Sequence, residues 1–434
     1  MLTISAITLG CKVNQYDTRA MVERFLARGY TEADADTPTD VVIVNTCTVT
    51  GESDRKSRQH IRRANRLNPA ASIIVSGCLA QRKAESLALP GVKLILGTAR
   101  RGEVADLLDK ARLSEGALIA VDSDIEEIFE PLSVAQGTEG RTRAIMKIEE
   151  GCDCRCAYCI IPSVRGNVRS RSLEEISREA ERIASAGYQE IVVTGINLSC
   201  YGKDFAMRTD LADALSAIGA SGIPRIRLSS LEPNIVSESF LDKLKRTDAL
   251  CPHFHMALQS GCDATLARMR RPYNLARFTE EVCLLRGAYP SCSITTDMIV
   301  GFPAETEEEF ARTLDFVRET GFSRLHVFPY SVREGTPAAA MTGQIPTEAK
   351  KERAARLIAL GRELEQAYVL RKIGGVSSVL FEREIISQGE AFAEGYTEDY
   401  LRARLRASSA IGEITDVRLT GYDGDCVSAE KYRA

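Results

Sequence analysis

The sequence predicts an α/β fold in three parts: an open parallel sheet, a partial barrel of six β/α units and a small all-β barrel. Over the first hundred residues, short apolar runs rich in β-branched residues alternate with helical patterns, which is typical of a parallel sheet. A second and longer alternating series begins near residue 144. From residue 376 the pattern changes to short β-branched runs separated by turn residues, which is typical of a small barrel.

The elements of the two series follow from their hydrophobic patterns. In the first series we expect strands at residues 2–9, 40–44, 72–76 and 94–96, and helices at 17–28 and 53–65. In the second we expect strands at 144–148, 190–194, 225–228, 253–258, 293–300 and 324–328, and helices at 172–186, from 210, and at 237–246, 275–288 and 305–320. One long charged helix follows at 347–372.

The domain boundaries are predicted where the composition changes. Residues 122–140 are acidic, lack periodicity and form the best linker candidate. We therefore expect an N-terminal domain at 1–121, the linker at 122–140, the barrel with its following helix at 141–374, and the all-β domain at 375–434. In barrels of β/α units the chemistry lies at the carboxyl ends of the strands.

The bulk composition is that of a globular protein, with 27% charged residues and a net charge of −4. No apolar run approaches the roughly 18 residues that a membrane span needs, and the N-terminus lacks the pattern of a signal peptide. We therefore expect a cytoplasmic protein without membrane association. Its thirteen cysteines then indicate metal or redox roles rather than disulfides. The isolated Cys283 and Cys292 are expected to be buried small hydrophobes.

The strongest motif is a group of closely spaced cysteines after the first strand of the second series. Cys152, Cys156 and Cys159, called here the loop cysteines, have C-x3-C-x2-C spacing. Such a loop can hold three corners of a 4Fe–4S cubane and leave one iron open, and the amine and carboxylate of S-adenosylmethionine (SAM) can chelate an open iron. A structural zinc site is the alternative, because Cys154 lies within the run. Four cysteines within eight residues would strain a tetrahedral zinc site.

A second set of cysteines is dispersed along the first series. Cys11, Cys47 and Cys78, called here the rim cysteines, each fall just past the carboxyl end of an expected strand. In an open parallel sheet these ends share one rim, so three thiolates more than thirty residues apart can converge. Gly10, Thr46 and Gly77 precede them and leave room for a bulky cluster. Coincidence is the alternative, because cysteine at a strand end is common.

With these two cysteine sets and the stretches around them, the chain resembles the radical SAM methylthiotransferase family along essentially its whole length. The matching stretches are TLGCKVNQYD, VNTCTVT, SGCLAQR, EGCDCRCAYCIIP, RGNVRSR, LSSLEP, HMALQSG, LARMRRPY, DMIVGFPAETEEEF and HVFPYSVREGTPAA. The resemblance implies an auxiliary-cluster domain, a radical SAM barrel and a C-terminal TRAM domain that contacts RNA. TLGCKVNQYD and NTCTVT are most similar to the branch that acts on threonylcarbamoyladenosine at tRNA position 37.

The resemblance also implies cofactors and partners. The loop cysteines would hold a SAM-binding 4Fe–4S cluster, and the rim cysteines an auxiliary 4Fe–4S cluster. One SAM would yield the 5′-deoxyadenosyl radical, and a second would donate the methyl group of the 2-methylthio product. The tRNA anticodon loop and a flavodoxin- or ferredoxin-like reductant are the expected partners, and a monomer is the expected state. No catalytic side chain is assigned beyond the clusters.

Candidates for the SAM cleft lie at the ends of the barrel strands. Glycine lets the backbone approach a ligand, and a carboxylate can bind a ribose hydroxyl or the methionyl amine. Each position taken alone is more often a turn or capping residue. The candidates are Gly195, Asn197, Ser229, Ser230, Glu232, Gln259 and Gly301.

Several basic groups are candidates for RNA contact, although a charge run is usually a solvated helix face. The groups are Arg55, Lys56, Arg58, Arg62, Arg63 and Arg66; Arg165, Arg169 and Arg171; and Arg268, Arg270 and Arg271. Residues 375–434 carry seven Lys/Arg against eleven Asp/Glu. The C-terminal domain must therefore use a local patch, for which Arg402, Arg404 and Arg406 share one face of a strand.

Two kinds of alternative function stay open. The same chemistry could act on isopentenyladenosine in tRNA or on an aspartate of a ribosomal protein. A non-catalytic iron–sulfur protein that binds RNA or transfers electrons is the alternative from another class. The length of the barrel and the LSSLEP and GFPAETEEEF stretches count against it, because an electron carrier needs no SAM cleft.

Overall fold

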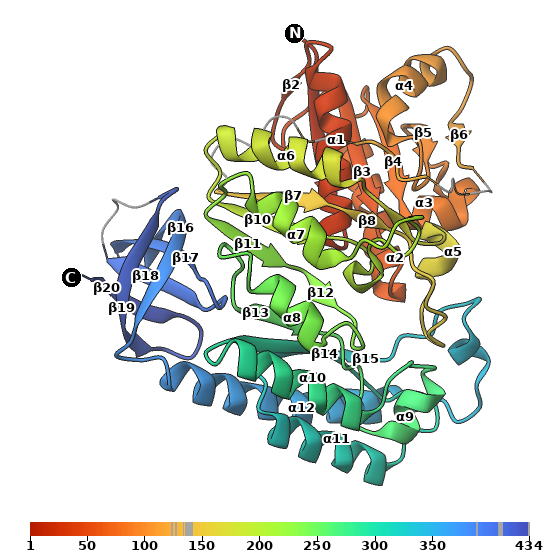
Figure 1. The fold of residues 1–434 in the computed structure, drawn as a ribbon. Coiled ribbons are helices and arrows are strands. Elements are labelled where there is room, and N and C mark those ends of the chain that lie inside the picture. Colours follow the sequence, from red (N-terminus) through yellow and green to blue (C-terminus); the bar gives the residue numbers. More distant parts are fainter. Residues whose placement is uncertain are drawn as a thin grey trace.

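The computed structural model describes residues 1–122, 125, 128–132, 134, 142–387, 389–406 and 411–432. Most of the linker predicted at 122–140 lies outside these residues. Figure 1 shows the N-terminal sheet at the top, the partial barrel below it and the C-terminal barrel at the left. The predicted α/β class with a small all-β barrel is confirmed. Within the described residues, no helix has the length and apolar character that a membrane crossing requires.

The N-terminal sheet is entirely parallel, in the order β2-β1-β3-β4-β5-β6. Its strands are β1 (Thr3–Thr8), β2 (Thr31–Glu32), β3 (Val41–Thr46), β4 (Ser72–Gly77), β5 (Val92–Leu96) and β6 (Leu118–Ala120). Its helices are α1 (Lys12–Leu26), α2 (Gly51–Leu67), α3 (Cys78–Lys83) and α4 (Val104–Arg112). Apolar side chains of α1 and α4 pack on one face of the sheet and those of α2 and α3 on the other.

The middle part is an open barrel built from two short sheets, β11-β10-β7 and β12-β13-β14-β15, joined by a bridge between Ile226 and Leu250. Its strands are β7 (Arg143–Lys147), β10 (Glu190–Thr194), β11 (Arg225–Leu228), β12 (Ser230–Leu231), β13 (His253–Met256), β14 (Ser293–Val300) and β15 (Arg324–Pro329). A separate antiparallel pair, β8 (Glu149–Glu150) and β9 (Arg169–Ser170), follows β7.

Helices cover the outside of this barrel and share one large apolar core with the outward-facing strand residues. They are α6 (Leu173–Ser185), α7 (Leu211–Gly219), α8 (Glu238–Leu244), α9 (Asp263–Arg268), α10 (Leu275–Ala288) and α11 (Glu307–Thr320). The short helix α5 (Ile161–Arg165) lies instead against α3 of the N-terminal part. Two of the covering helices begin with a reciprocal capping box, Asp210 with Asp213 and Thr306 with Glu309. In such a box each side chain satisfies the other residue's backbone N–H.

The long helix α12 (Thr347–Leu370) leads into a closed five-stranded barrel in the order β16-β17-β18-β20-β19. Its strands are β16 (Val376–Ser387), β17 (Glu390–Thr397), β18 (Arg402–Arg406), β19 (Ile414–Tyr422) and β20 (Val427–Lys431). Closure removes the free strand edges. Arg227 of β11 docks this barrel against the middle part by donating to the carbonyls of Thr397 and Glu398.

The structure corrects three local expectations. Helix α1 begins at Lys12 rather than at 17, because Val13 is the one apolar residue among Lys12–Gln15 and gives only a weak helical signal there. The short helices α3, α4, α5 and α9 were not expected. Cys283, expected to be buried, is exposed on α10, whereas Cys292 is buried.

Replacing Arg227 with Ala should destabilise the protein strongly. Arg227 is buried and pairs with the buried Glu190 at 2.8 Å, so the variant leaves a buried carboxylate short of its main partner. Loss of one member of a buried ion pair costs about 3–5 kcal/mol. The urea midpoint should fall well below that of an Arg62→Ala control, whose side chain is exposed on α2. Equal midpoints would show that the contact is dispensable.

Candidate functional site

The loop cysteines follow β8 in a tight loop held by backbone hydrogen bonds. Cys152 N donates to Gly166 O at 3.0 Å, and Cys159 N donates to Cys156 O at 3.1 Å. Gly151 has a φ of +83°, and a β-carbon there would lie 1.8 Å from Asn167 O. Only glycine fits this position. The loop therefore gathers its thiols at the carboxyl end of the barrel strands.

Asn197 and Glu149 carry buried polar atoms without partners beside this loop. The Nδ2 atom of Asn197 lies 3.6 Å from the sulfurs of both Cys152 and Cys154, and its backbone N donates to Glu149 at 2.6 Å. Within the described residues, Asn197 Oδ1 and Glu149 Oε1 are buried and make no hydrogen bond. Leaving buried polar atoms unpaired costs free energy. The loop therefore fits a ligand that brings polar groups of its own, as SAM does.

Arg271 links the loop to Glu232. Its Nη1 atom donates to Cys156 Sγ at 3.1 Å, and its Nη2 atom forms an ion pair with Glu232. Burial raises the pKa of Glu232, and the charge of Arg271 opposes that rise. Glu232 thus lies where a SAM contact was expected. Arg271, expected on an RNA-binding surface, is instead buried beside the loop.

The other candidates for the SAM cleft lie at strand ends with varied accessibility. Ser230 is exposed, Ser229 is half-buried and Gln259 is nearly buried in a left-handed conformation. At Gly301, where φ is +70°, a β-carbon would lie 2.4 Å from Lys350 Cγ, so both backbone and packing require glycine at this strand end. At Gly195 a β-carbon would lie 2.6 Å from Glu149 Oε2, which ties that glycine to the loop region.

The rim cysteines meet at the ends of β1, β3 and β4, which are neighbours in the sheet. A β-carbon at Gly10 would lie 3.0 Å from Cys47 Sγ, and one at Gly77 would lie 2.5 Å from Thr46 O. Both glycines have left-handed φ angles, so only glycine allows this approach. Cys47 and Cys78 are buried and Cys11 is exposed. Three thiols gathered at one rim can serve as the ligands of an iron–sulfur cluster.

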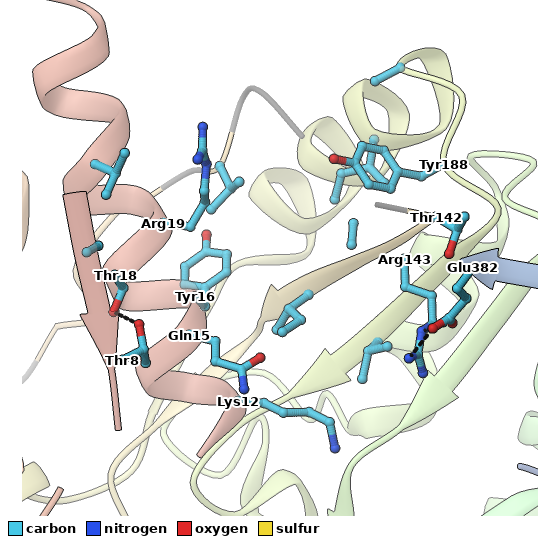
Figure 2. Close-up of a pocket in the computed structure, with 18 of the residues that line it drawn as sticks. Thr8, Lys12, Gln15, Tyr16, Thr18, Arg19, Thr142, Arg143, Tyr188 and Glu382 are labelled. Carbon is cyan, nitrogen blue, oxygen red and sulfur yellow. Dashed lines mark hydrogen bonds and ion pairs between the residues drawn. The ribbon is translucent and has the colours of Figure 1, made fainter. Parts of the chain in front are cut away.

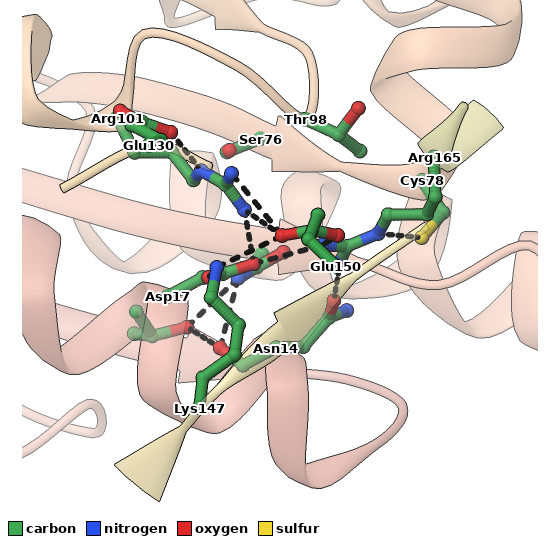
Figure 3. Close-up of polar contacts among 12 residues, drawn as sticks. Asn14, Asp17, Ser76, Cys78, Thr98, Arg101, Glu130, Lys147, Glu150 and Arg165 are labelled. Carbon is green, nitrogen blue, oxygen red and sulfur yellow. Dashed lines mark hydrogen bonds and ion pairs between the residues drawn. The ribbon is translucent and has the colours of Figure 1, made fainter. Parts of the chain in front are cut away.

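A buried ion network joins the two cysteine sets (Figure 3). It consists of Asp17, Arg101, Lys147, Glu150 and Arg165, all of whose side chains are at most 3% exposed. Lys147 lies 2.6 Å from Asp17 and 2.8 Å from Glu150. Arg165 lies 3.0 Å from Asp17 and 2.7 Å from Glu150. Asp17 belongs to α1 and Glu150 precedes the loop cysteines, so the network fixes one domain against the other.

Arg165 extends the network to the rim cysteines. Its Nε atom donates to Cys78 Sγ at 3.2 Å. Burial, together with Cys11 and Cys47, raises the pKa of the Cys78 thiol to about 11, and Arg165 opposes that rise. The network contains three cations and two buried carboxylates. A further carboxylate, Glu130, pairs with Arg101 at the edge of the network. The positive charge at Arg165 therefore favours a thiolate at Cys78.

The carboxylates of the network stay ionised. Burial alone would raise the pKa of Glu150, but Arg165, Lys147 and Arg101 outweigh it and hold the pKa well below the ordinary value. The pKa of Asp17 is lowered in the same way against the effect of burial, by Arg101, Lys147 and Arg165. Glu149 lacks these partners, and burial raises its pKa well above the ordinary value. The pKa values of the two adjacent glutamates are therefore shifted in opposite directions.

A cavity of about 770 Å³ lies where the three parts of the chain meet (Figure 2). Lys12 and Tyr16 of α1 line one side, Arg143 of β7 another, and Glu382 and Tyr400 of the C-terminal barrel a third. Arg143 pairs with Glu382. This cavity was not expected from the sequence, because its wall comes from three distant segments.

The structure corrects the expected basic surfaces. Arg165, Arg169 and Arg171 are buried, so they cannot bind RNA phosphates at the protein surface. On the C-terminal barrel, Arg402, Arg404 and Arg406 do share one face of β18, but each pairs with a carboxylate of the same barrel. On helix α2 most of the basic side chains are exposed, although Arg55 pairs with Glu52 and Arg63 with Asp36. The exposed ones are Arg55, Lys56, Arg62, Arg63 and Arg66.

The sequence interpretation missed Glu149, Asp17 and Lys147 as parts of the site. One signal was available: charged residues in the strand-like stretch AIMKIEEGC, directly before the loop cysteines. In the described residues, no three cysteine, histidine or carboxylate side chains are placed to hold a single metal ion. A zinc ion needs its ligands around one centre, whereas a cubane spreads its thiolates over separate corners. The fold and the two cysteine sets are those that the resemblance to radical SAM iron–sulfur proteins implies.

Comparison with known proteins identifies the family. The model of the radical SAM superfamily matches residues 146–317, and that of "uncharacterized protein family UPF0004" matches residues 3–97. The threonylcarbamoyladenosine tRNA methylthiotransferase MtaB of Bacillus subtilis is 41% identical, over 97% of this chain and 95% of its own. The protein of the same name from Thermotoga maritima is 37% identical, over 96% and 94%. The chain belongs to the radical SAM methylthiotransferases and is of the MtaB type.

A relative with a different named product is also similar. The tRNA-2-methylthio-N(6)-dimethylallyladenosine synthase of Bacillus velezensis is 36% identical, over 95% of this chain and 82% of its own. Among solved structures, the radical SAM methyltransferase TsrM of Kitasatospora setae has a TM-score of 0.58 at 16% identity, over 78% of this chain and 77% of that one. That likeness supports the fold alone. The protein is a transferase that uses 4Fe–4S clusters and SAM, and the non-catalytic alternative is wrong.

Replacing Glu150 with Gln should destabilise the protein at neutral pH by about 3–5 kcal/mol, because it leaves buried cations short of a partner. A carboxylate with a depressed folded pKa stabilises the fold above its unfolded pKa of about 4.3. That stabilisation is lost as the pH falls through the folded value. The variant's free energy of unfolding should therefore fall less steeply than wild type below about pH 5. Urea unfolding across pH measures this, with Glu85→Gln as an exposed control; parallel curves would contradict it.

Proposed function

We propose that this protein converts threonylcarbamoyladenosine at position 37 of tRNA to its 2-methylthio derivative. One SAM would provide the 5′-deoxyadenosyl radical and a second the methyl group. The observation that carries the proposal is the 41% identity, over 97% of the chain, to a relative named for this substrate. Both cysteine sets fall within the span of that similarity.

We assign the loop cysteines (Cys152, Cys156, Cys159) to a SAM-binding 4Fe–4S cluster and the rim cysteines (Cys11, Cys47, Cys78) to an auxiliary one. The chemistry that these groups supply when bound is reductive cleavage of SAM at the first and presentation of sulfur at the second. The chain's own residues bind, orient and exclude water. Asn197 and Glu149 offer unpaired polar atoms to SAM. Arg271 donates to Cys156 and pairs with Glu232, and so holds Glu232 near the loop cysteines. Gly195, Ser229, Gln259 and Gly301 complete the proposed cleft.

We propose one role for each of the predicted domains. Residues 1–121 carry the auxiliary site, 141–374 the SAM site, and 375–434 an RNA-contacting barrel. Exposed arginines of α2 support contact with the anticodon stem, because phosphate contacts give affinity without sequence readout. A flavodoxin- or ferredoxin-like protein would supply electrons. We place the enzyme in the cytoplasm, with its tRNA substrate, as a monomer.

Deleting the gene should remove methylthio-threonylcarbamoyladenosine from cellular tRNA and let its unmethylthiolated precursor accumulate. Mass spectrometry of tRNA nucleosides measures both species, and complementation with the intact gene should restore the wild-type pattern. Loss of methylthio-isopentenyladenosine instead would assign the other tRNA substrate. Unchanged tRNA would overturn the proposal and direct the search to ribosomal proteins.

The two cysteine sets should have separable roles. Cys152→Ala, Cys156→Ala or Cys159→Ala should abolish formation of 5′-deoxyadenosine, because the SAM-binding iron is lost. Cys47→Ala should leave some 5′-deoxyadenosine but no methylthiolated product, with lower iron content after reconstitution. Cys283→Ala, on the exposed face of α10, is the matched control and should behave like wild type. Full methylthiolation by Cys47→Ala would contradict the auxiliary assignment.

A further inference from the structure

Three of the four histidines of the chain gather inside the open barrel. His253 and His255 alternate on β13 with Phe254 and Met256, which pack into the outer core. The inward face therefore carries the histidines. His255 Nδ1 lies 2.9 Å from Thr295 Oγ1, and its Nε2 lies 3.4 Å from Asp297 Oδ2.

His326 of β15 completes this inner polar face. Its ring centroid lies 5.6 Å from that of His255, and β15 pairs with β14 so that His326 stands beside Asp297. His326 is exposed, and so is Phe328, which follows it on the same face of the strand. Barrel interiors are usually filled with branched apolar side chains. An accessible polar interior is instead a surface suited to a ligand.

Lys12 lies near this inner polar face. Burial lowers the pKa of His326, and the charges of His255, Arg324 and Lys12 lower it further, although Asp297 opposes them. The charge of Lys12 also lowers the pKa of His253, which burial lowers most. In Figure 2 its side chain extends from the first turn of α1 toward the barrel. Lys12 directly follows the rim residue Cys11 in the sequence.

The charge of Lys12 is uncompensated, unlike that of the other cations that line the cavity of about 770 Å³ shown in Figure 2. Arg19 pairs with Glu32, Arg143 with Glu382 and Arg383 with Glu394. In the part of the chain that the structure describes, Lys12 makes no ion pair and is exposed. An exposed ammonium beside further hydrogen-bonding groups fits a ligand that carries one carboxylate and other polar atoms.

We propose that Lys12, His255, Asp297 and His326 form the subsite that binds the N6 substituent of the substrate adenine, with Lys12 receiving its carboxylate. This inference rests on the proposed function and adds the residues that recognise the N6 substituent of the substrate. A threonylcarbamoyl group has a carboxylate, a hydroxyl and a urea. An isopentenyl group has none of these and would leave the polar face unpaired. Sites built for hydrogen bonds reject such analogues strongly.

The test uses the reconstituted full-length enzyme and three synthetic anticodon stem-loops. One carries threonylcarbamoyladenosine, the second its carboxamide analogue and the third isopentenyladenosine. Binding is measured by fluorescence anisotropy and product by mass spectrometry. Wild type should bind the carboxylate form roughly tenfold to hundredfold more tightly than the carboxamide, the usual range for a charge-assisted hydrogen bond.

Lys12→Met should bring the two affinities together by weakening the carboxylate form alone, and Lys12→Arg should retain much of the preference. His326→Leu, at an exposed position, should weaken both polar forms more than the isopentenyl form. Lys110→Met, exposed on α4, removes the same charge elsewhere and should change nothing. Lys110→Met should also match wild type in iron content and in 5′-deoxyadenosine formation.

The outcomes separate this inference from the proposed function. If wild type methylthiolates the threonylcarbamoyl stem-loop but Lys12→Met keeps the full preference for its carboxylate, the subsite is wrong and the function stands. If wild type methylthiolates only the isopentenyl stem-loop, the proposed function is wrong and the subsite falls with it. Convergence of the two affinities in Lys12→Met supports the inference.

Discussion

The buried ion network is the interaction on which the arrangement of the site depends. Asp17 on α1 and Glu150 before the loop cysteines share Lys147 and Arg165, so neither domain satisfies its own charges alone. Isolated charges are very costly to bury. The two domains are therefore held in the one placement that pairs them, and the cysteine sets are fixed relative to each other as a result.

Local backbone geometry then shapes each half of the site. Left-handed glycines at positions 10 and 77 let three strand ends close around the rim cysteines. Gly151 does the same for the loop beside Asn167. Around the loop, Asn197 and Glu149 keep polar atoms unpaired, which costs free energy unless a ligand pairs with them.

Much of this architecture was predictable because its signals are local. Strand ends carry the cysteines, capping residues mark the helices, and the loop spacing indicates its cluster. The partners of Arg165 were not predictable, since Asp17 lies 148 residues away and a basic run usually faces solvent. The same holds for Arg271, whose burial beside Cys156 depends on the closed barrel. Arg402 could be placed on a strand face, but its carboxylate partners come from β17 and from the turn before β20.

The mixed origin of the buried ion network has a consequence for how such proteins diverge. Its members come from α1, the segment before α4, β7, β8 and α5, so its charge balance is spread over two domains. A chimera that joins this N-terminal sheet to the barrel of a distant relative would inherit unmatched charges at the seam unless the partner residues came with it. The two domains are thus constrained to be inherited and to vary as a pair.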